Sequence, residues 1–80
     1  MNTELTLDLN TFEKAKKFTD AANKFNSDID VIRDRYVIDA KSVIGIFTID
    51  LTKPVKVRII SDDAAEITRF NEQMEEFMWW

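Results

Sequence analysis

The amino-acid sequence predicts a single α+β domain in which helices cover one face of a four-stranded antiparallel sheet. Three observations lead to this prediction: short segments with strand patterning, longer segments with a helical period, and a length of 80 residues, which allows one hydrophobic core. Because strands and helices each show one apolar face, the other face of the sheet is expected to be open. The predicted order is β-α-β-β-α-β-α, within one domain spanning residues 1–80.

The first strand and the first long helix are predicted from residues 4–25. Apolar and polar side chains alternate over Glu4–Leu9, which is typical of a half-buried strand. Asn10 is the expected N-cap of the following helix, because Glu13 lies three residues later at the spacing of a capping box. The helix is expected over Thr11–Phe25. Its apolar residues recur at a helical period: Phe12, Ala15, Phe18, Ala22 and Phe25.

The remaining elements are predicted from residues 28–80. Three segments with β-branched or alternating residues are expected to form strands: Asp28–Arg33, Arg35–Ala40 and Val55–Ile60. A short turn near Asp34 is expected between the first two, although no Asn-Gly or Asp-Gly pair marks it. Ser42 is the candidate N-cap of a short helix over Val43–Thr48, which contains the only glycine. The last helix is expected to begin after the capping residues 61–63. Its predicted buried stripe is Ile67, Phe70, Met74 and Phe77.

The composition argues against several classes of function. The chain has no histidine and no cysteine, so the usual nucleophile–base pairs and zinc sites are not available. One glycine is too few for a phosphate-binding loop, and the acidic residues match no calcium loop, so no cofactor and no metal is predicted. The net charge of −4 and the scattered basic residues argue against nucleic-acid binding. No apolar run approaches the roughly 20 residues of a membrane span. The absence of cysteine favours a cytoplasmic protein, and the absence of both cysteine and histidine favours a binding domain over an enzyme.

Two stretches of the sequence resemble a known family. Ala40-Lys41-Ser42-Val43-Ile44-Gly45-Ile46-Phe47 is similar to the regulatory-serine segment of HPr, the histidine-containing phosphocarrier family of the bacterial sugar phosphotransferase system. Phe25-Asn26-Ser27-Asp28-Ile29-Asp30-Val31 resembles the family's passage from the first helix to the second strand. The length and the order of elements agree as well. The resemblance implies the HPr-like open-faced sandwich.

The same resemblance identifies a degenerate phosphoacceptor position. HPr proteins carry the phosphoacceptor histidine at the start of the first helix, in a Leu-His-x-Arg-Pro pattern. Counting back without gaps from the serine segment places Thr11 at the histidine, Glu13 at the arginine and Lys14 at the proline. A threonine cannot form an N-phosphate, and a carboxylate at Glu13 would repel a phosphoryl group that helix amides and an arginine stabilise in the family. We therefore expect no relay of phosphate through this chain.

The resemblance leaves two main hypotheses for the function. In the first, a serine kinase phosphorylates Ser42 and the product binds a transcriptional regulator, as in relatives that lack the histidine. Asp39 would oppose the added phosphate and Lys41 would offset this only in part. The alternative role of Ser42 is that of an N-cap alone.

In the second hypothesis, the chain is a constitutive protein-binding module without a covalent switch. Candidate partner-binding residues are Val43, Ile44, Phe47 and Lys17, with Thr11 and the lysines of residues 14–17 as a second, basic-edged surface. Other phosphotransferase-system proteins are the expected partners. A small-ligand regulatory domain is a third possibility. The terminal Trp79 and Trp80 are expected to cover the core or to make a contact in a weak homodimer.

Overall fold

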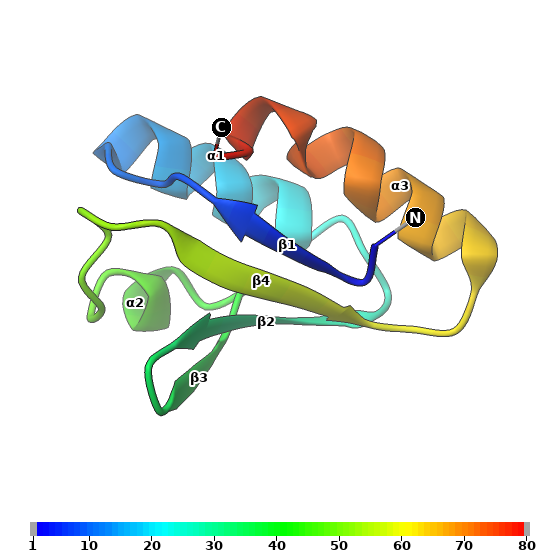
Figure 1. Ribbon diagram of the computed structural model, residues 1–80, viewed down its shortest axis with the longest axis horizontal. Helices are drawn as coiled ribbons and strands as arrows, with labels where there is room; N and C mark the ends of the chain where they lie inside the picture. Colours follow the sequence, from blue (N-terminus) through cyan, green and yellow to red (C-terminus); the bar gives the residue numbers. More distant parts are fainter. Residues whose placement is uncertain (1, 80) are drawn as a thin grey trace.

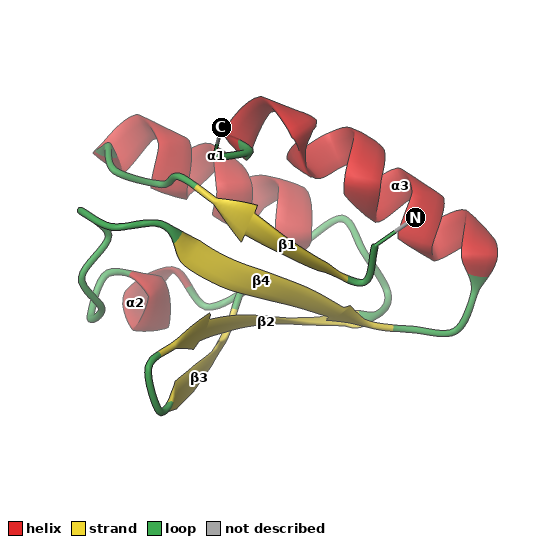
Figure 2. Ribbon diagram, viewed as in Figure 1, coloured by secondary structure: helices red, strands yellow, loops and turns green. Residues whose placement is uncertain are grey.

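The computed structural model describes residues 2–79 and has the predicted order of elements. Four strands form one antiparallel sheet in the order β1-β4-β2-β3: β1 (Glu4–Leu7), β2 (Asp28–Arg33), β3 (Tyr36–Asp39) and β4 (Val55–Ile60). The long helices α1 (Phe12–Ala22) and α3 (Ala64–Met74) lie side by side, and α2 (Val43–Ile46) lies near β2 and β3 (Figure 1). A 3-10 turn, η1 (Glu75–Phe77), follows α3. The four-stranded antiparallel α+β prediction is confirmed (Figure 2).

The hydrophobic core lies between the sheet and the helices. Val55, Val57 and Ile59 of β4 are buried, whereas the residues between them are exposed, because successive side chains of a strand point to opposite faces. β4 pairs with β1 on one side and with β2 on the other, so it is one of the two inner strands of the sheet. From the helices, the fully buried apolar side chains are Ala15, Phe18, Ala22, Ile46, Phe70 and Met74.

The start of α1 differs from the prediction. Thr11, not Asn10, is the N-cap: its backbone is extended (φ −122°, ψ 154°) and its Oγ1 accepts a hydrogen bond from the amide of Lys14 at 3.1 Å. The predicted capping box between Asn10 and Glu13 is therefore wrong. Both Asn10 and Thr11 have side chains that can cap a helix, and sequence spacing alone does not distinguish them. The helix is also shorter than predicted, ending at Ala22 instead of Phe25, although Phe25 is still buried.

Two strands are shorter than predicted. β1 ends at Leu7, and Leu9 is buried without belonging to a strand. β3 covers only Tyr36–Asp39, because the preceding turn includes Arg35. Asp34 in this turn has a left-handed conformation with φ 54°. Such a conformation costs aspartate less than it costs most residues, so the turn forms without a glycine. β2 and β4 have the predicted bounds.

The two helices after β3 begin as predicted. Ser42 caps α2, and its Oγ accepts a hydrogen bond from the Gly45 amide at 3.1 Å. The regular helix is shorter than the predicted apolar segment and ends at Ile46. Asp63, within the predicted capping stretch 61–63, caps α3 through a hydrogen bond from the Ala65 amide at 3.0 Å.

The C-terminal segment pairs with the outer edge of β1. Leu7 and Met78 form an antiparallel bridge, and the Trp79 amide donates to the Thr6 carbonyl at 3.1 Å. The Asp8 amide donates to the Phe77 carbonyl at 2.7 Å. The backbone of Trp79 is thus held, but its side chain is 56% exposed and does not cover the core, which was the first of the two expectations for it. The second, a contact in a homodimer, stays a prediction. Trp80 lies outside the described residues.

Candidate functional site

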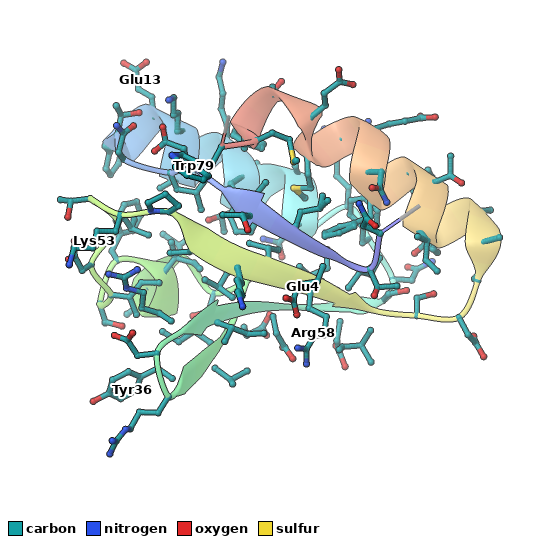
Figure 3. The ribbon with its side chains drawn as sticks, viewed as in Figure 1. Glu4, Glu13, Tyr36, Lys53, Arg58 and Trp79 are labelled. Carbon is teal, nitrogen blue, oxygen red and sulfur yellow. The ribbon has the colours of Figure 1, made fainter. Side chains whose placement is uncertain are left out.

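The first turn of α1 holds the three residues of the degenerate phosphoacceptor position. The Thr11 hydroxyl oxygen is occupied as the acceptor of the N-cap hydrogen bond. Glu13 is exposed and extends away from the body of the domain (Figure 3). The Lys14 ammonium points back to the preceding loop, 3.6 Å from Asp8 Oδ2 and 3.4 Å from Asn10 Oδ1. In this turn Thr11 therefore caps the helix, the Glu13 carboxylate is exposed, and the Lys14 ammonium contacts Asp8 and Asn10.

Phe12 connects this turn to α2. Its side chain was predicted to lie on the buried stripe of the first helix, but it is 69% exposed. Instead of entering the core, the ring stacks on Phe47, with 5.2 Å between ring centroids and 19° between ring planes. Two aromatic rings that stack this way attract each other by about 0.5–1.5 kcal/mol beyond the area they bury. The stack brings the start of α1 and the end of α2 together.

The exposed residues of α2 continue this apolar area. Val43, Ile44 and Phe47 are all exposed, with Ile44 at 82%, while Ile46 on the opposite side of the short helix is fully buried. The structure thus separates the members of the predicted apolar segment: one anchors the helix in the core and three face solvent. We refer to Phe12, Val43, Ile44 and Phe47 together as the apolar surface. Three of the predicted partner-binding residues, Val43, Ile44 and Phe47, lie in this surface. Phe12 is the member that the sequence analysis did not predict.

Ser42 lies next to the apolar surface, immediately before Val43. Its side chain is exposed, and its Oγ has the single role of capping α2. The neighbouring Lys41 ammonium is directed elsewhere, because it donates to the Phe25 carbonyl at 2.8 Å. The Asp39 carboxylate accepts from the Lys41 amide at 2.9 Å. Lys41 therefore links this segment to the segment after α1 through its side chain and to Asp39 through its amide.

The predicted basic edge on α1 is less continuous than expected. Lys14 is tethered to the loop, and Lys16 forms an ion pair with Asp20 at 2.8 Å. Lys17 is exposed on the same helix. The lysines of residues 14–17 thus differ in their surroundings and do not all present a free charge to the apolar surface.

On the rest of the described surface, the features that could bind a metal ion or a small molecule would be clusters of metal-ligating side chains and cavities. Among residues 2–79 no cluster of three or more acidic side chains has a geometry that could hold a metal ion. An open groove of about 550 Å³ lies between the β2–β3 turn and the segment after α2, and its charged residues are Arg33, Asp34, Asp50 and Lys53. Hydrogen bonds from the Thr52 hydroxyl and amide hold the pKa of the lining residue Asp50 below its usual value. No helix in the described part of the chain is long and apolar enough to cross a membrane.

Comparisons with known proteins agree on one family. The family model described as the phosphorylation site of the HPr component of the phosphotransferase system matches residues 12–78, so the match begins one residue after Thr11. The solved structure of HPr-C-His from Thermoanaerobacter tengcongensis is similar, with a TM-score of 0.71, 26% identity and coverage of 95% of this chain and 93% of that one. A search of curated proteins gave no significant match.

Two further structures are similar in fold. The phosphocarrier protein HPr from Bacillus anthracis has a TM-score of 0.71 at 20% identity, covering 94% of this chain and 93% of the other. The histidine-containing phosphocarrier protein of a Mycoplasma has a TM-score of 0.66 at 18% identity, covering 91% and 90%. The coverage is nearly complete in both directions, so the shared fold extends over the whole domain.

Proposed function

Because this chain belongs to the HPr family of the phosphotransferase system, whose model spans residues 12–78, we propose that it is a protein-binding member of that family that does not carry phosphate on histidine. The observation that carries this proposal is the Phe12–Phe47 stack, which joins the start of α1 and the end of α2 into one apolar surface. A soluble domain rarely leaves neighbouring large apolar side chains in water unless they contact a partner. The partners proposed are proteins of the phosphotransferase system or regulators linked to it, in the cytoplasm.

The absence of phosphocarrier activity follows from side-chain chemistry. The sequence contains no histidine, so no imidazole nitrogen is available as acceptor at any position. The hydroxyl at Thr11 could form only a phosphate ester, and its oxygen already accepts the amide hydrogen bond that caps α1. Glu13 adds a negative charge where a transferred phosphoryl group would approach. Incubation with phosphoenolpyruvate and the first enzyme of the phosphotransferase system should leave the intact mass unchanged. A gain of one phosphate on the chain under these conditions would contradict the proposal.

Binding can be tested by NMR titration of the isotope-labelled chain with purified phosphotransferase-system proteins. We expect amide shifts around residues 11–17 and 42–48, and at least a tenfold weaker affinity for Ile44→Ser, which removes an exposed apolar anchor (a change of about 1.4 kcal/mol). The matched control is Ile60→Ser, because Ile60 is also an exposed isoleucine but lies on the sheet. Equal weakening by both variants, or shifts confined to other residues, would contradict the location of the site.

A second proposal is that phosphorylation of Ser42 regulates this binding. Its support is position: Ser42 is exposed and adjoins Val43 and Ile44 of the apolar surface. A phosphate there would bring close to two negative charges to the edge of the surface and could still accept the Gly45 amide. The nearby Asp39 would oppose it.

The test is the intact mass of the protein purified from its native host grown in rich and in poor sugar supply, with peptide mapping. Phosphate on Ser42 under either condition supports regulation. Unmodified protein under both would leave the constitutive binding module as the function, with Ser42 as a helix cap.

A further inference from the structure

The outer edge of β3 differs from the outer edge of β1. The C-terminal segment pairs with β1 through the Leu7–Met78 bridge, whereas β3 is the last strand on the other side of the sheet. β3 pairs with β2 alone, in the register Arg33 with Tyr36 and Val31 with Ile38. Unpaired backbone groups at such an edge are a template for another strand. The C-terminal segment covers the end of β1 near Leu7, whereas none of the described residues pairs with the outer edge of β3 as a strand.

The register shows which backbone groups point outward. The Ala40 amide donates to the Ile29 carbonyl at 2.8 Å, so Ala40 faces β2. Because hydrogen-bonding direction alternates along an antiparallel strand, Ile38 and Tyr36 also face β2, and Val37 and Asp39 direct their backbone groups to the open edge. The Asp39 carbonyl already accepts the Ser42 amide at 3.0 Å, so a second strand would share this acceptor through its other lone pair. Val37 is 64% exposed.

We propose that β3 pairs antiparallel with the β3 strand of a second copy of this chain, about a two-fold axis at Val37. The reason is that the segment is self-complementary in charge. Pairing Val37 with its own copy places Arg35 of each chain opposite Asp39 of the other. Charged residues ordinarily protect a sheet edge because a second copy brings the same charge, but here the two-fold axis brings together opposite charges.

A second observation supports the second copy as the occupant. Within one chain, Asp30 of β2 lies directly opposite Asp39 of β3, and like charges in this position repel. The cation on the other side of Asp30 in the register is Arg58, but its guanidinium is paired with Glu4 at 2.7 Å. Figure 3 labels both side chains. Arg35 forms no ion pair with any residue in the range 2–79.

The second copy thus supplies the missing positive charge. The row of cross-strand neighbours would read Glu4, Arg58, Asp30, Asp39 and then Arg35 of the other chain, so that Asp39 gains an opposite charge next to it. On the helix side, the exposed Tyr36 of each chain would lie opposite Ile38 of the other, beside the groove that both residues line. The repulsion that destabilises the single chain becomes part of an attractive arrangement in the dimer.

The size of the contact predicts a weak dimer. A strand pair of four or five residues from each chain buries less than the roughly 1,200 Å² of a stable interface, so we expect a dissociation constant of about 0.1–1 mM. The arrangement leaves the contact dependent on two exposed ion pairs. Added salt should therefore weaken the dimer, since the screening length falls to about 3 Å at 1 M ionic strength.

Sedimentation equilibrium at low ionic strength tests the pairing. Arg35→Asp or Asp39→Arg alone places like charges opposite each other twice and should weaken the dimer at least tenfold. An equimolar mixture of the two variants restores both opposite-charge pairs and should dimerise as the parent does. The matched control Lys24→Asp makes the same charge change as Arg35→Asp on an exposed residue after α1, and it should not change the dissociation constant of the dimer.

A backbone variant makes the test independent of charge. Val37→Pro removes an outward amide without removing a hydrogen bond to β2, so it should abolish the dimer while the amide NMR spectrum shows a folded domain. A parent that stays monomeric at about tenfold above the expected dissociation constant would overturn the proposal. The proposal would also be overturned if the mixture of Arg35→Asp and Asp39→Arg dimerised no better than either variant alone, or if Val37→Pro left the dimer unchanged. None of these outcomes bears on partner binding at the apolar surface.

Discussion

Replacing Gly45 by alanine tests how α2 is fixed to the sheet. No glycine in the described residues has a positive φ, so Gly45 is not required for an unusual backbone conformation. Its environment leaves little room for a side chain, because a Cβ added there would lie 2.9 Å from Cγ2 of Ile38 and 3.2 Å from Oγ of Ser42. A contact of 2.9 Å between carbons requires a shift, and Ile38 is a β-branched residue of β3 with restricted freedom at χ1.

Two opposing effects set the magnitude for Gly45→Ala. Alanine is favoured over glycine in a helix by about 1 kcal/mol, mostly because the unfolded chain loses freedom. Forcing a methyl group into a well-packed contact costs about 1–3 kcal/mol. We therefore expect a net loss of about 1 kcal/mol in the free energy of unfolding. In an Ile38→Ala background the clashing methyl is gone, so the same change should be neutral or stabilising by up to about 1 kcal/mol.

Urea denaturation of the four proteins in this double-mutant cycle measures the difference. The parent, both single variants and the double variant are compared at equal m-value, so that the free energies of unfolding can be subtracted. The expected coupling between the two positions is about 1–2 kcal/mol. If Gly45→Ala stabilises the parent as much as it stabilises the Ile38→Ala protein, the close approach of α2 to β3 is not what the glycine serves.

Three further predictions follow from single contacts. Thr11→Ala should lower the free energy of unfolding by about 1 kcal/mol through loss of the N-cap, and Thr11→Ser should restore most of it in urea denaturation; equal losses in both would refute the capping role. Phe12→Ala should cost at most about 1.5 kcal/mol because the ring is largely exposed, and a double-mutant cycle with Phe47→Ala should show coupling between the two rings. The hydrogen bond from Arg58 holds the pKa of Glu4 below its usual value, so an NMR titration should show a lowered pKa that returns towards the usual value in Arg58→Gln. The stabilising effect of this pair should be present above the unfolded pKa and disappear as the pH falls through the lower folded value.

The sequence predicted best those elements whose pattern is repeated and whose neighbours lie close in the chain. β2 and β4 alternate over six residues each, and their bounds were predicted correctly. Ser42 was predicted as the cap of α2 for a local reason, since only its hydroxyl lies at the start of that apolar segment. The start of α1 was predicted wrongly because Asn10 and Thr11 both satisfy the local rule for an N-cap.

The apolar surface could be predicted only in part. Val43, Ile44 and Phe47 were candidates because they follow a capping serine, but Phe12 was assigned to the core. The spacing of Phe12 from Ala15 fits the helical period of the buried residues of α1. This period indicates which side of the helix faces the sheet, but it does not indicate how far the sheet extends below the helix. The stacking of Phe12 on Phe47 joins residues far apart in the sequence, and no local pattern predicts such a contact.

The pairing of residues 77–79 with β1 also determines when this domain can finish folding during its synthesis. β1 is made first, yet its partners are β4 and the segment around Met78, which are made last. Because translation proceeds from the N-terminus, β1 emerges long before any strand that can pair with it. Its apolar residues Leu5 and Leu7 must therefore remain unpaired while most of the chain is produced. The nascent chain should become resistant to proteolysis in one late step, after residue 78 has left the ribosome.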